Sequence, residues 1–316
     1  MRSSRIAAAL GTTAALALGA LPLSAPAQTP GAAEIGQRLG PSYAQLVNLS
    51  ASPDLTTARY HVRSDPGVRL DVTRLPVAGK TYDWNERTLL ETRLVAGYLR
   101  LASEIPVNGA SPGRLDTRWV AYGLTAGVGA RITLDDRFTL VPGFDAGVAQ
   151  LENRTDYLGG AAFAQPLFDG TVFNWRSHAW LATPSAGLEW ADETDVRRIE
   201  IRTRLAWSRV ASFGESDPAL RFRKSGGTFS VRGELTSPTN WAWFGRSPAW
   251  VLLAGHTAFL GPGRDVLGFP WISEVGAGLE WPSRASSDAP ARLRVTLSGL
   301  FGPDVRGLTA GVGIEY

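Results

Sequence analysis

The chain of 316 residues contains no cysteine, only three histidines and only two lysines. Without cysteine, a disulfide framework, a thiolate nucleophile and a cysteine-ligated metal are all excluded. Beyond Gln28, no apolar run is long enough to cross a bilayer as a helix. The formal net charge of +3 falls to about +1 without Arg2 and Arg5, and no basic block follows, so we expect no nucleic-acid binding.

The N-terminus has the three parts of a secretory signal. Arg2 and Arg5 supply a positive start, residues 6–20 are apolar, and Ala25-Pro26-Ala27 has the small residues that a signal peptidase prefers. An uncleaved membrane anchor is the alternative, but the apolar stretch is short for one. We therefore predict that residues 1–27 are removed and that the folded protein begins at Gln28.

The last nine residues alternate in character up to the C-terminus. One face of this segment is apolar and the opposite face carries Thr309, Gly311, Gly313 and Glu315. Such a strand suits a wall between lipid and a polar interior, and an open sheet edge cannot survive in lipid, so the wall has to close. We predict an all-β fold, a closed antiparallel transmembrane β-barrel. The apolar face also resembles the C-terminal insertion signal of bacterial outer-membrane proteins, and its residues are Leu308, Ala310, Val312, Ile314 and Tyr316.

Alternating segments and turn signals divide residues 55–316 into about 12 strands. An even number puts both ends of the barrel on the periplasmic side. Asp135-Asp136 lies between two such strands and is interpreted as a hairpin turn rather than a carboxylate pair. The predicted strands are 55–64, 67–77, 86–103, 117–133, 137–152, 177–190, 196–211, 227–237, 249–261, 269–281, 291–302 and 307–316.

Residues 28–54 form a leader between the signal and the barrel. Within residues 32–48, Ile35, Leu39, Tyr43 and Leu46 recur at spacings of three or four, which suggests a short helix. This helix could plug the lumen or sit in the periplasm, and a disordered leader is the alternative.

Charged residues recur on the polar faces of several predicted strands, where they are tolerable only in a wet or paired lumen. Glu189 and Arg198 flank one hairpin, and Glu280 and Arg292 flank another. A ladder of ion pairs that fills and rigidifies the barrel is the favoured interpretation, and a selective pore or a groove that grips a threaded segment is the alternative. The residues predicted to line the lumen are Glu189, Arg198, Glu200, Arg202, Arg204, Glu280, Arg292 and Arg294.

The sequence offers little that could carry catalysis. His61, His178 and His256 have no second histidine at metal-ligand spacing, and neither a nucleophile elbow nor a zinc-protease motif occurs. His256 would face the lumen if its neighbours Val251, Leu253, Thr257 and Phe259 faced lipid. We therefore assign no catalytic residue, no metal site and no cofactor.

Two features resemble the translocator domains of autotransporters. They are the segment 137–147 (RFTLVPGFDAG) and the strand ending Ala-Gly-Leu-Glu-Trp, which occurs at 186–190 and 277–281. The resemblance covers about residues 55–316 and implies a twelve-stranded barrel with a helix in its pore. Such domains follow a long secreted passenger, whereas only about 27 residues separate the predicted signal from the first strand here. The chain is therefore expected to be a solitary barrel without a passenger.

The expected location is the outer membrane of a Gram-negative bacterium, and the expected role is structural, pore-forming or transport-accessory. The alternative is a barrel enzyme that acts on lipid or peptide. The expected partners are outer-membrane lipids with lipopolysaccharide, the barrel-assembly machinery during insertion, and small solutes or ions. The barrel is expected to be a monomer.

Overall fold

The computed structural model describes residues 57–62, 68–107, 111–170, 172–216, 220–242, 247–261, 264, 269–282 and 292–315. The predicted signal, the leader and Tyr316 lie outside these residues. Among the described residues, no helix combines the length and the apolar character needed to cross a membrane.

Strands account for nearly all of the described chain, and the helical elements described at one end of the barrel are the short η1 (Gly160–Ala164) and α3 (Gln165–Phe168). The strands are β1 (Thr57–Val62), β2 (Arg69–Asn85), β3 (Thr88–Val107), β4 (Gly113–Thr133), β5 (Phe138–Gly159), β6 (Arg176–Thr194), β7 (Arg197–Phe213), β8 (Arg223–Pro238), β9 (Ala249–Leu260), β10 (Trp271–Pro282), β11 (Arg292–Phe301) and β12 (Val305–Glu315).

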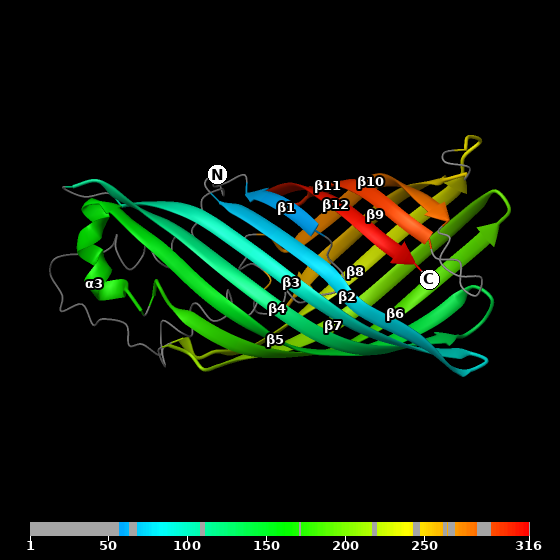
Figure 1. The fold of residues 1–316 in the computed structure, drawn as a ribbon, viewed down its shortest axis with the longest axis horizontal. Helices are drawn as coiled ribbons and strands as arrows, with labels where there is room; N and C mark the ends of the chain where they lie inside the picture. The colour runs from blue at the N-terminus through cyan, green and yellow to red at the C-terminus, as the bar shows by residue number, and fades with distance from the viewer. Residues whose placement is uncertain are drawn as a thin grey trace.

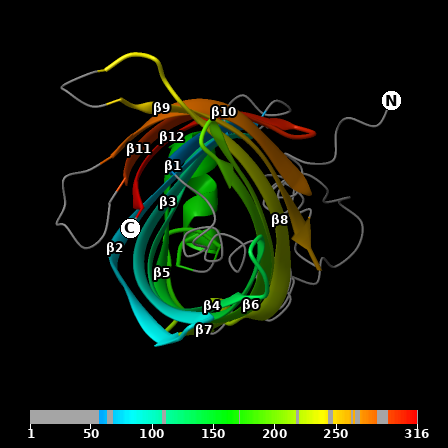
Figure 2. The same ribbon diagram turned by 90° about the vertical axis from the view of Figure 1, so that its right-hand side faces the viewer.

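The strands form one closed barrel in which each is antiparallel to its neighbours (Figures 1 and 2). The ring closes where β1 pairs with β12, from Thr57 opposite Ala310 to Val62 opposite Val305. Closure leaves no strand with an unpaired edge, as a lipid environment requires. The prediction of an all-β closed antiparallel barrel of about 12 strands is confirmed.

The two ends of the barrel differ. The β2–β3, β4–β5 and β6–β7 hairpins lie at one end together with the C-terminal end of β12, and we call this the turn end (Figure 1). The opposite end, the loop end, carries η1 and α3. Strands β2 to β7 have 17 to 22 residues, whereas β9 to β12 have 10 to 12, so the wall is taller on one side.

Strand β2 is longer than the sequence predicted. We expected it to end at residue 77, but it continues to Asn85. The pairing with β3 shifts between Pro76 and Ala78, and this bulge absorbs the proline and lets the ladder resume. Asn85 Oδ1 then accepts a hydrogen bond from the backbone N–H of Arg87 at 3.0 Å and closes a tight hairpin.

The Asp135-Asp136 segment is a hairpin turn, as predicted. The carboxylate of Asp135 accepts hydrogen bonds from the backbone N–H groups of Arg137 and Phe138 at 2.8 and 2.9 Å. These bonds favour the ionised form and hold the pKa of Asp135 below its usual value. The acidic residue therefore shapes the turn between β4 and β5.

The outer face of the barrel is apolar. Side chains along each strand alternate between exposed and buried, and in a closed barrel the buried set faces the interior. The exposed set includes many large hydrophobic residues, which would be an aggregation hazard in water but suit contact with lipid. Examples are Tyr122, Leu124, Val128, Leu140, Phe144, Val148, Leu188, Ile201, Leu205, Trp207, Phe229, Leu252, Val275, Val295, Leu297, Leu308 and Val312.

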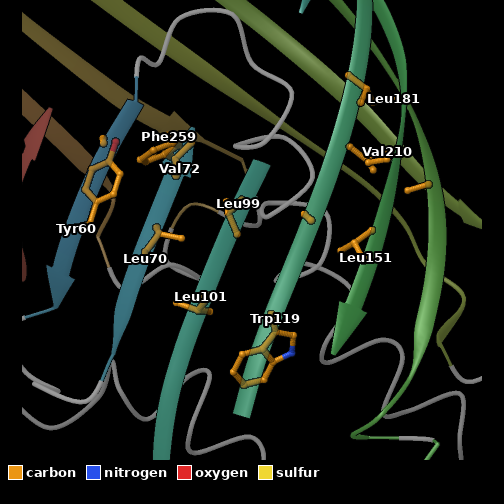
Figure 3. Close-up of a cluster of buried hydrophobic side chains, with 14 of the residues drawn as sticks. Tyr60, Leu70, Val72, Leu99, Leu101, Trp119, Leu151, Leu181, Val210 and Phe259 are labelled. Carbon is orange, nitrogen blue, oxygen red and sulfur yellow. The ribbon is translucent and has the colours of Figure 1, made fainter. Parts of the chain in front are cut away.

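The inner face near the loop end is also apolar, which the sequence analysis did not anticipate. Buried side chains from most strands form one cluster, which we call the apolar band (Figure 3). Trp119 of β4 is one of these buried inner residues. The band includes Tyr60, Leu70, Val72, Leu99, Leu101, Trp119, Leu151, Leu181, Val210, Phe259, Phe269, Ile272, Leu300 and Val305.

The face assigned to β9 was wrong. Val251, Leu253 and Phe259 are buried, whereas Leu252 is exposed. Both faces of this strand are apolar, so alternation of hydrophobicity alone could not distinguish inside from outside.

Candidate functional site

The inner face near the turn end carries charged side chains on eight strands. They occupy the buried or half-buried positions that alternate with the exposed apolar ones, and ion pairs connect them. We call the set the lumen charge network. It contains eight arginines and seven carboxylates, namely Glu91, Arg93, Arg131, Asp145, Glu189, Arg198, Glu200, Arg202, Arg204, Arg232, Glu234, Glu274, Glu280, Arg292 and Arg294.

Arg294 and Glu280 form the most buried part of the network. Arg294 donates from Nη1 to Glu234 Oε2 and from Nη2 to Glu280 Oε2, both at 2.5 Å. Arg198 Nη2 lies 3.1 Å from Glu280 Oε2. Because Arg198 is on β7 and Glu280 is on β10, this contact bridges two strands that are not hydrogen-bonded neighbours. Glu280 therefore ties together two parts of the wall that backbone pairing does not join.

A second centre forms around Asp145, whose side chain is only 4% exposed. Arg93 grips it with two hydrogen bonds of 2.8 Å, and Arg204 Nη2 donates to Oδ2 at 3.1 Å. The hydrogen bonds between Arg93 and Asp145 cross over Gly127 of β4, where a Cβ atom would lie 2.0 Å from Asp145 Oδ1. Glycine is therefore required at this position for β3, β5 and β7 to meet through their side chains.

Arg204 and Leu205 are adjacent residues on opposite faces of β7, so they test which face of the barrel wall contacts lipid and which faces the lumen. Leu205 is 51% exposed on the outer face, so Leu205→Arg is expected to lower the free energy of unfolding by about 2–4 kcal/mol if it lies near the bilayer midplane. Arg204→Leu is expected to lower the free energy of unfolding much less, because Arg93 still pairs with Asp145. Urea unfolding in lipid vesicles measures both, and equal losses would contradict the assignment of faces.

The third centre joins β4 to β6. Arg131 donates from Nη1 to Glu189 Oε1 at 3.2 Å, makes a second bond from Nη2 to Oε2, and places Nε 3.5 Å from Glu91. Glu200 sits between Arg198, at 3.0 Å, and Arg202. Like the Arg93–Asp145 pair, the Arg131–Glu189 pair spans one intervening strand, whereas Arg198 and Glu280 are separated by two.

The eight charged positions predicted from the sequence all carry an ion pair within 4 Å. Glu189 pairs with Arg131 and not with Arg198, because the register of the hairpin places Arg202 opposite Glu189 and Glu193 opposite Arg198. Arg292 does approach Glu280 across its hairpin, at 3.6 Å. The role of these eight charged residues in lining a path for solutes stays a prediction.

Seven members of the network were missed in the sequence. Arg232 and Glu234 could have been found, because they alternate with Val231 and Leu235, which follow the same pattern as the predicted lumen residues of β7. Asp145 gave no such signal, since it is a single charge among small and aromatic residues. The missed members are Glu91, Arg93, Arg131, Asp145, Arg232, Glu234 and Glu274.

A cavity of about 470 Å³ lies inside the barrel, and residues from every strand from β3 to β12 line it. Network arginines such as Arg93, Arg204 and Arg232 form part of its wall, and Ile272 and Leu300 of the apolar band also contribute. The cavity therefore lies where the charged and apolar parts of the inner face meet.

The histidine side chains are not members of the network, although His256 contributes to the wall of the cavity. His256 is exposed on the outer face, with Nδ1 2.9 Å from Ser273 Oγ and its ring 5.5 Å from that of Trp271, so its predicted position in the lumen was wrong. His178 stacks on Phe213 at 5.7 Å. Within the described ranges, no group of three or more potential ligands could hold a metal ion.

The C-terminal strand has the expected faces where its side chains are described. Leu308, Ala310 and Val312 are exposed, whereas Thr309 between them is buried. The backbone of Ile314 pairs with Leu293 of β11. The proposed insertion signal therefore starts on the outer face of β12, and its last residue, Tyr316, lies outside the described residues.

Comparisons with known proteins agree with this architecture. A family model described as a solitary outer membrane autotransporter beta-barrel domain matches residues 64–307. The translocator domain of the autotransporter NalP from Neisseria meningitidis is similar in fold, with 14% identity, a TM-score of 0.51, and coverage of 89% of this chain and 93% of that one. The transport unit of the autotransporter AIDA-I from Escherichia coli has 10% identity, a TM-score of 0.50, and coverage of 87% and 97%. None of the curated proteins compared with the chain matches it.

Proposed function

Because the chain belongs to the family of solitary outer-membrane autotransporter β-barrel domains, we propose that it acts as an occluded barrel with a structural or transport-accessory role, not as an open pore. The observation that carries this proposal is the pairing within the lumen charge network. A conducting pore of fixed selectivity presents rings of one sign to the passing ion. Here arginines and carboxylates alternate and neutralise one another, so their hydrogen-bonding groups are used within the wall.

The apolar band supports occlusion in a second way. Hydrophobic constrictions in channels stop ion flow by losing water. The band combines large side chains such as Tyr60, Trp119 and Phe259 on the inner face near the loop end. Ions that entered from the turn end would meet this apolar surface beyond the cavity.

The leader supplies a candidate plug. Its apolar residues Ile35, Leu39, Tyr43 and Leu46 recur at helical spacing, and the apolar band offers a surface on which such side chains could be buried. We therefore propose that residues 32–48 occupy the lumen after residues 1–27 have been removed. The proposal also places the loop end outside the cell, the terminal strand in contact with the barrel-assembly machinery during insertion, and the barrel in the membrane as a monomer.

Deleting residues 32–48 tests the plug. The strands carry the wall, so the shortened protein is expected to fold and to give a larger single-channel conductance than the full mature chain in a planar bilayer. Neutralising Arg202 and Arg204 in the shortened protein is then expected to move ion selectivity toward cations. An unchanged current after the deletion would place the segment outside the lumen.

A further inference from the structure

The outer face of β3 and β4 changes from apolar to basic within two residues, and outward arginines also occur near the loop end of β5 and β6. On β4 the last apolar outward residue toward the loop end is Val120, and the next outward residue is Arg118. On β3, Arg100 follows Tyr98 in the same way. Arg176 is the first residue of β6, at the loop end of that strand. On β5, Arg154 also faces outward, but Gln150 and Glu152 lie between it and the last apolar outward residue, Val148.

The length of the apolar face places these arginines at the membrane surface. Outward residues of β4 from Ile132 to Val120 are apolar or small and span 13 positions. At a rise of about 3.4 Å per residue and a tilt of about 40°, they cover roughly 30 Å, close to the thickness of the hydrocarbon core. Arg118 therefore lies at the level of the lipid headgroups.

Arg118 and Arg154 lie directly opposite each other on β4 and β5. Both side chains are exposed on the same face, where directly opposed residues have Cβ atoms about 4.5–5.5 Å apart, and like charges in this arrangement are destabilising. Arg154 donates to Glu152 at 3.0 Å. In the described part of the chain, neither Arg118 nor the neighbouring Arg100 has an ion-pair partner. Asp116 and Asp156 lie opposite each other in the next outward row toward the loop end, so an external anion would add counter-charge on the membrane side of the arginines.

An aromatic pair borders the arginines on the membrane side. Tyr98 and Tyr122 face each other across β3 and β4 with ring centroids 5.4 Å apart. Tyrosine suits the interface between hydrocarbon and headgroups, since its ring is apolar and its hydroxyl is polar. The surface therefore combines an interfacial anchor with three guanidinium groups whose planar geometry favours bidentate binding of phosphate.

We propose that the surface formed by Tyr98, Arg100, Arg118, Tyr122 and Arg154 binds the phosphorylated sugar headgroup of lipopolysaccharide in the outer leaflet. The cluster of guanidinium groups fits a headgroup that carries more than one phosphate better than the single phosphate of an ordinary phospholipid. Glu152 also contacts Arg176, at 3.4 Å, and so holds the arginines on either side of it in place. This inference rests on the proposed orientation of the barrel, with the loop end outside the cell, and the site would then attach the taller side of the barrel to the outer leaflet.

The test uses the full mature chain in mixed micelles with lipid A carrying two phosphates. The readout is the temperature at which the compact folded band disappears on a gel of unboiled protein. Lipid A is expected to raise this temperature for the wild type. The double variant Arg118→Gln/Arg154→Gln is expected to need about tenfold more lipid A for half of the maximal rise. The matched control is Arg306→Gln, which removes an exposed arginine from the outer face of β12 and is expected to keep the wild-type response.

Two further lipids distinguish the source of the phosphate. Lipid A from which the phosphates have been removed and phosphatidylglycerol are both expected to stabilise the wild type much less. The proposal would be overturned if the double variant and the wild type responded equally to lipid A, or if either comparison lipid stabilised the wild type as well as phosphorylated lipid A does. The folded band in the absence of lipid A reports barrel integrity independently.

Discussion

Glu280→Gln is expected to lower the free energy of unfolding by about 3–5 kcal/mol, the usual cost of removing one member of a buried ion pair. Glu280 is the shared acceptor of Arg198 and Arg294, and all three side chains are at most 10% exposed. The amide keeps the size of the side chain but removes the negative charge, so Arg294 is left with Glu234 and Arg198 with Glu200, and each buried guanidinium loses one of its two carboxylates. Urea unfolding of the refolded barrel in lipid vesicles measures the loss.

Asp192→Asn is the matched control for this change. It makes the same carboxylate-to-amide replacement in a pair with Arg137, which is 62% exposed and 3.4 Å away near the turn end. Solvent-exposed pairs contribute only about 0–1 kcal/mol, so little loss of stability is expected. Similar small losses in both variants would mean that the lumen charges are solvated and do not stabilise the wall.

Deleting Tyr316 is expected to remove most of the folded barrel from the outer membrane while export across the inner membrane continues. On our proposal the terminal strand has two tasks, because β12 is recognised during insertion and also closes the wall against β1. Its outward row of Leu308, Ala310 and Val312 needs an aromatic end at the headgroup level. Membrane fractionation with gels of unboiled and boiled protein measures the assembled barrel.

Tyr316→Phe keeps the aromatic end and is expected to assemble normally, which separates loss of the aromatic ring from loss of the hydroxyl. Normal amounts of folded barrel after deletion of Tyr316 would contradict the interpretation of the C-terminus as an insertion signal. Reduced export of the unfolded chain would instead point to an earlier step.

The sequence predicted the barrel because several strands have one clearly apolar face. In β7, Ile199, Ile201, Leu205 and Trp207 alternate with arginines and Glu200, so both the strand and its faces could be assigned. In β9 both faces are apolar, and the wrong face was chosen. The difference lies in the inner wall, which is charged near the turn end and apolar near the loop end.

The ion-pair partners could not be predicted because they depend on the curvature of the closed wall. Arg198 meets Glu280 across β8 and β9, and Arg93 meets Asp145 across β4. Sequence spacing indicates which residues share a face, but contacts between strands that are not neighbours follow from the strand number and the stagger of the barrel. The apolar band escaped prediction for a related reason, since its members come from distant segments that meet only on closure.

Occlusion of the lumen is tested most directly by the conductance of refolded residues 28–316 in a planar lipid bilayer. The paired charge network and the apolar band predict a current close to that of the lipid alone, with at most brief openings. Large, stable conductance steps that scale with salt concentration would show an open water-filled path and would contradict the proposal that this barrel is occluded.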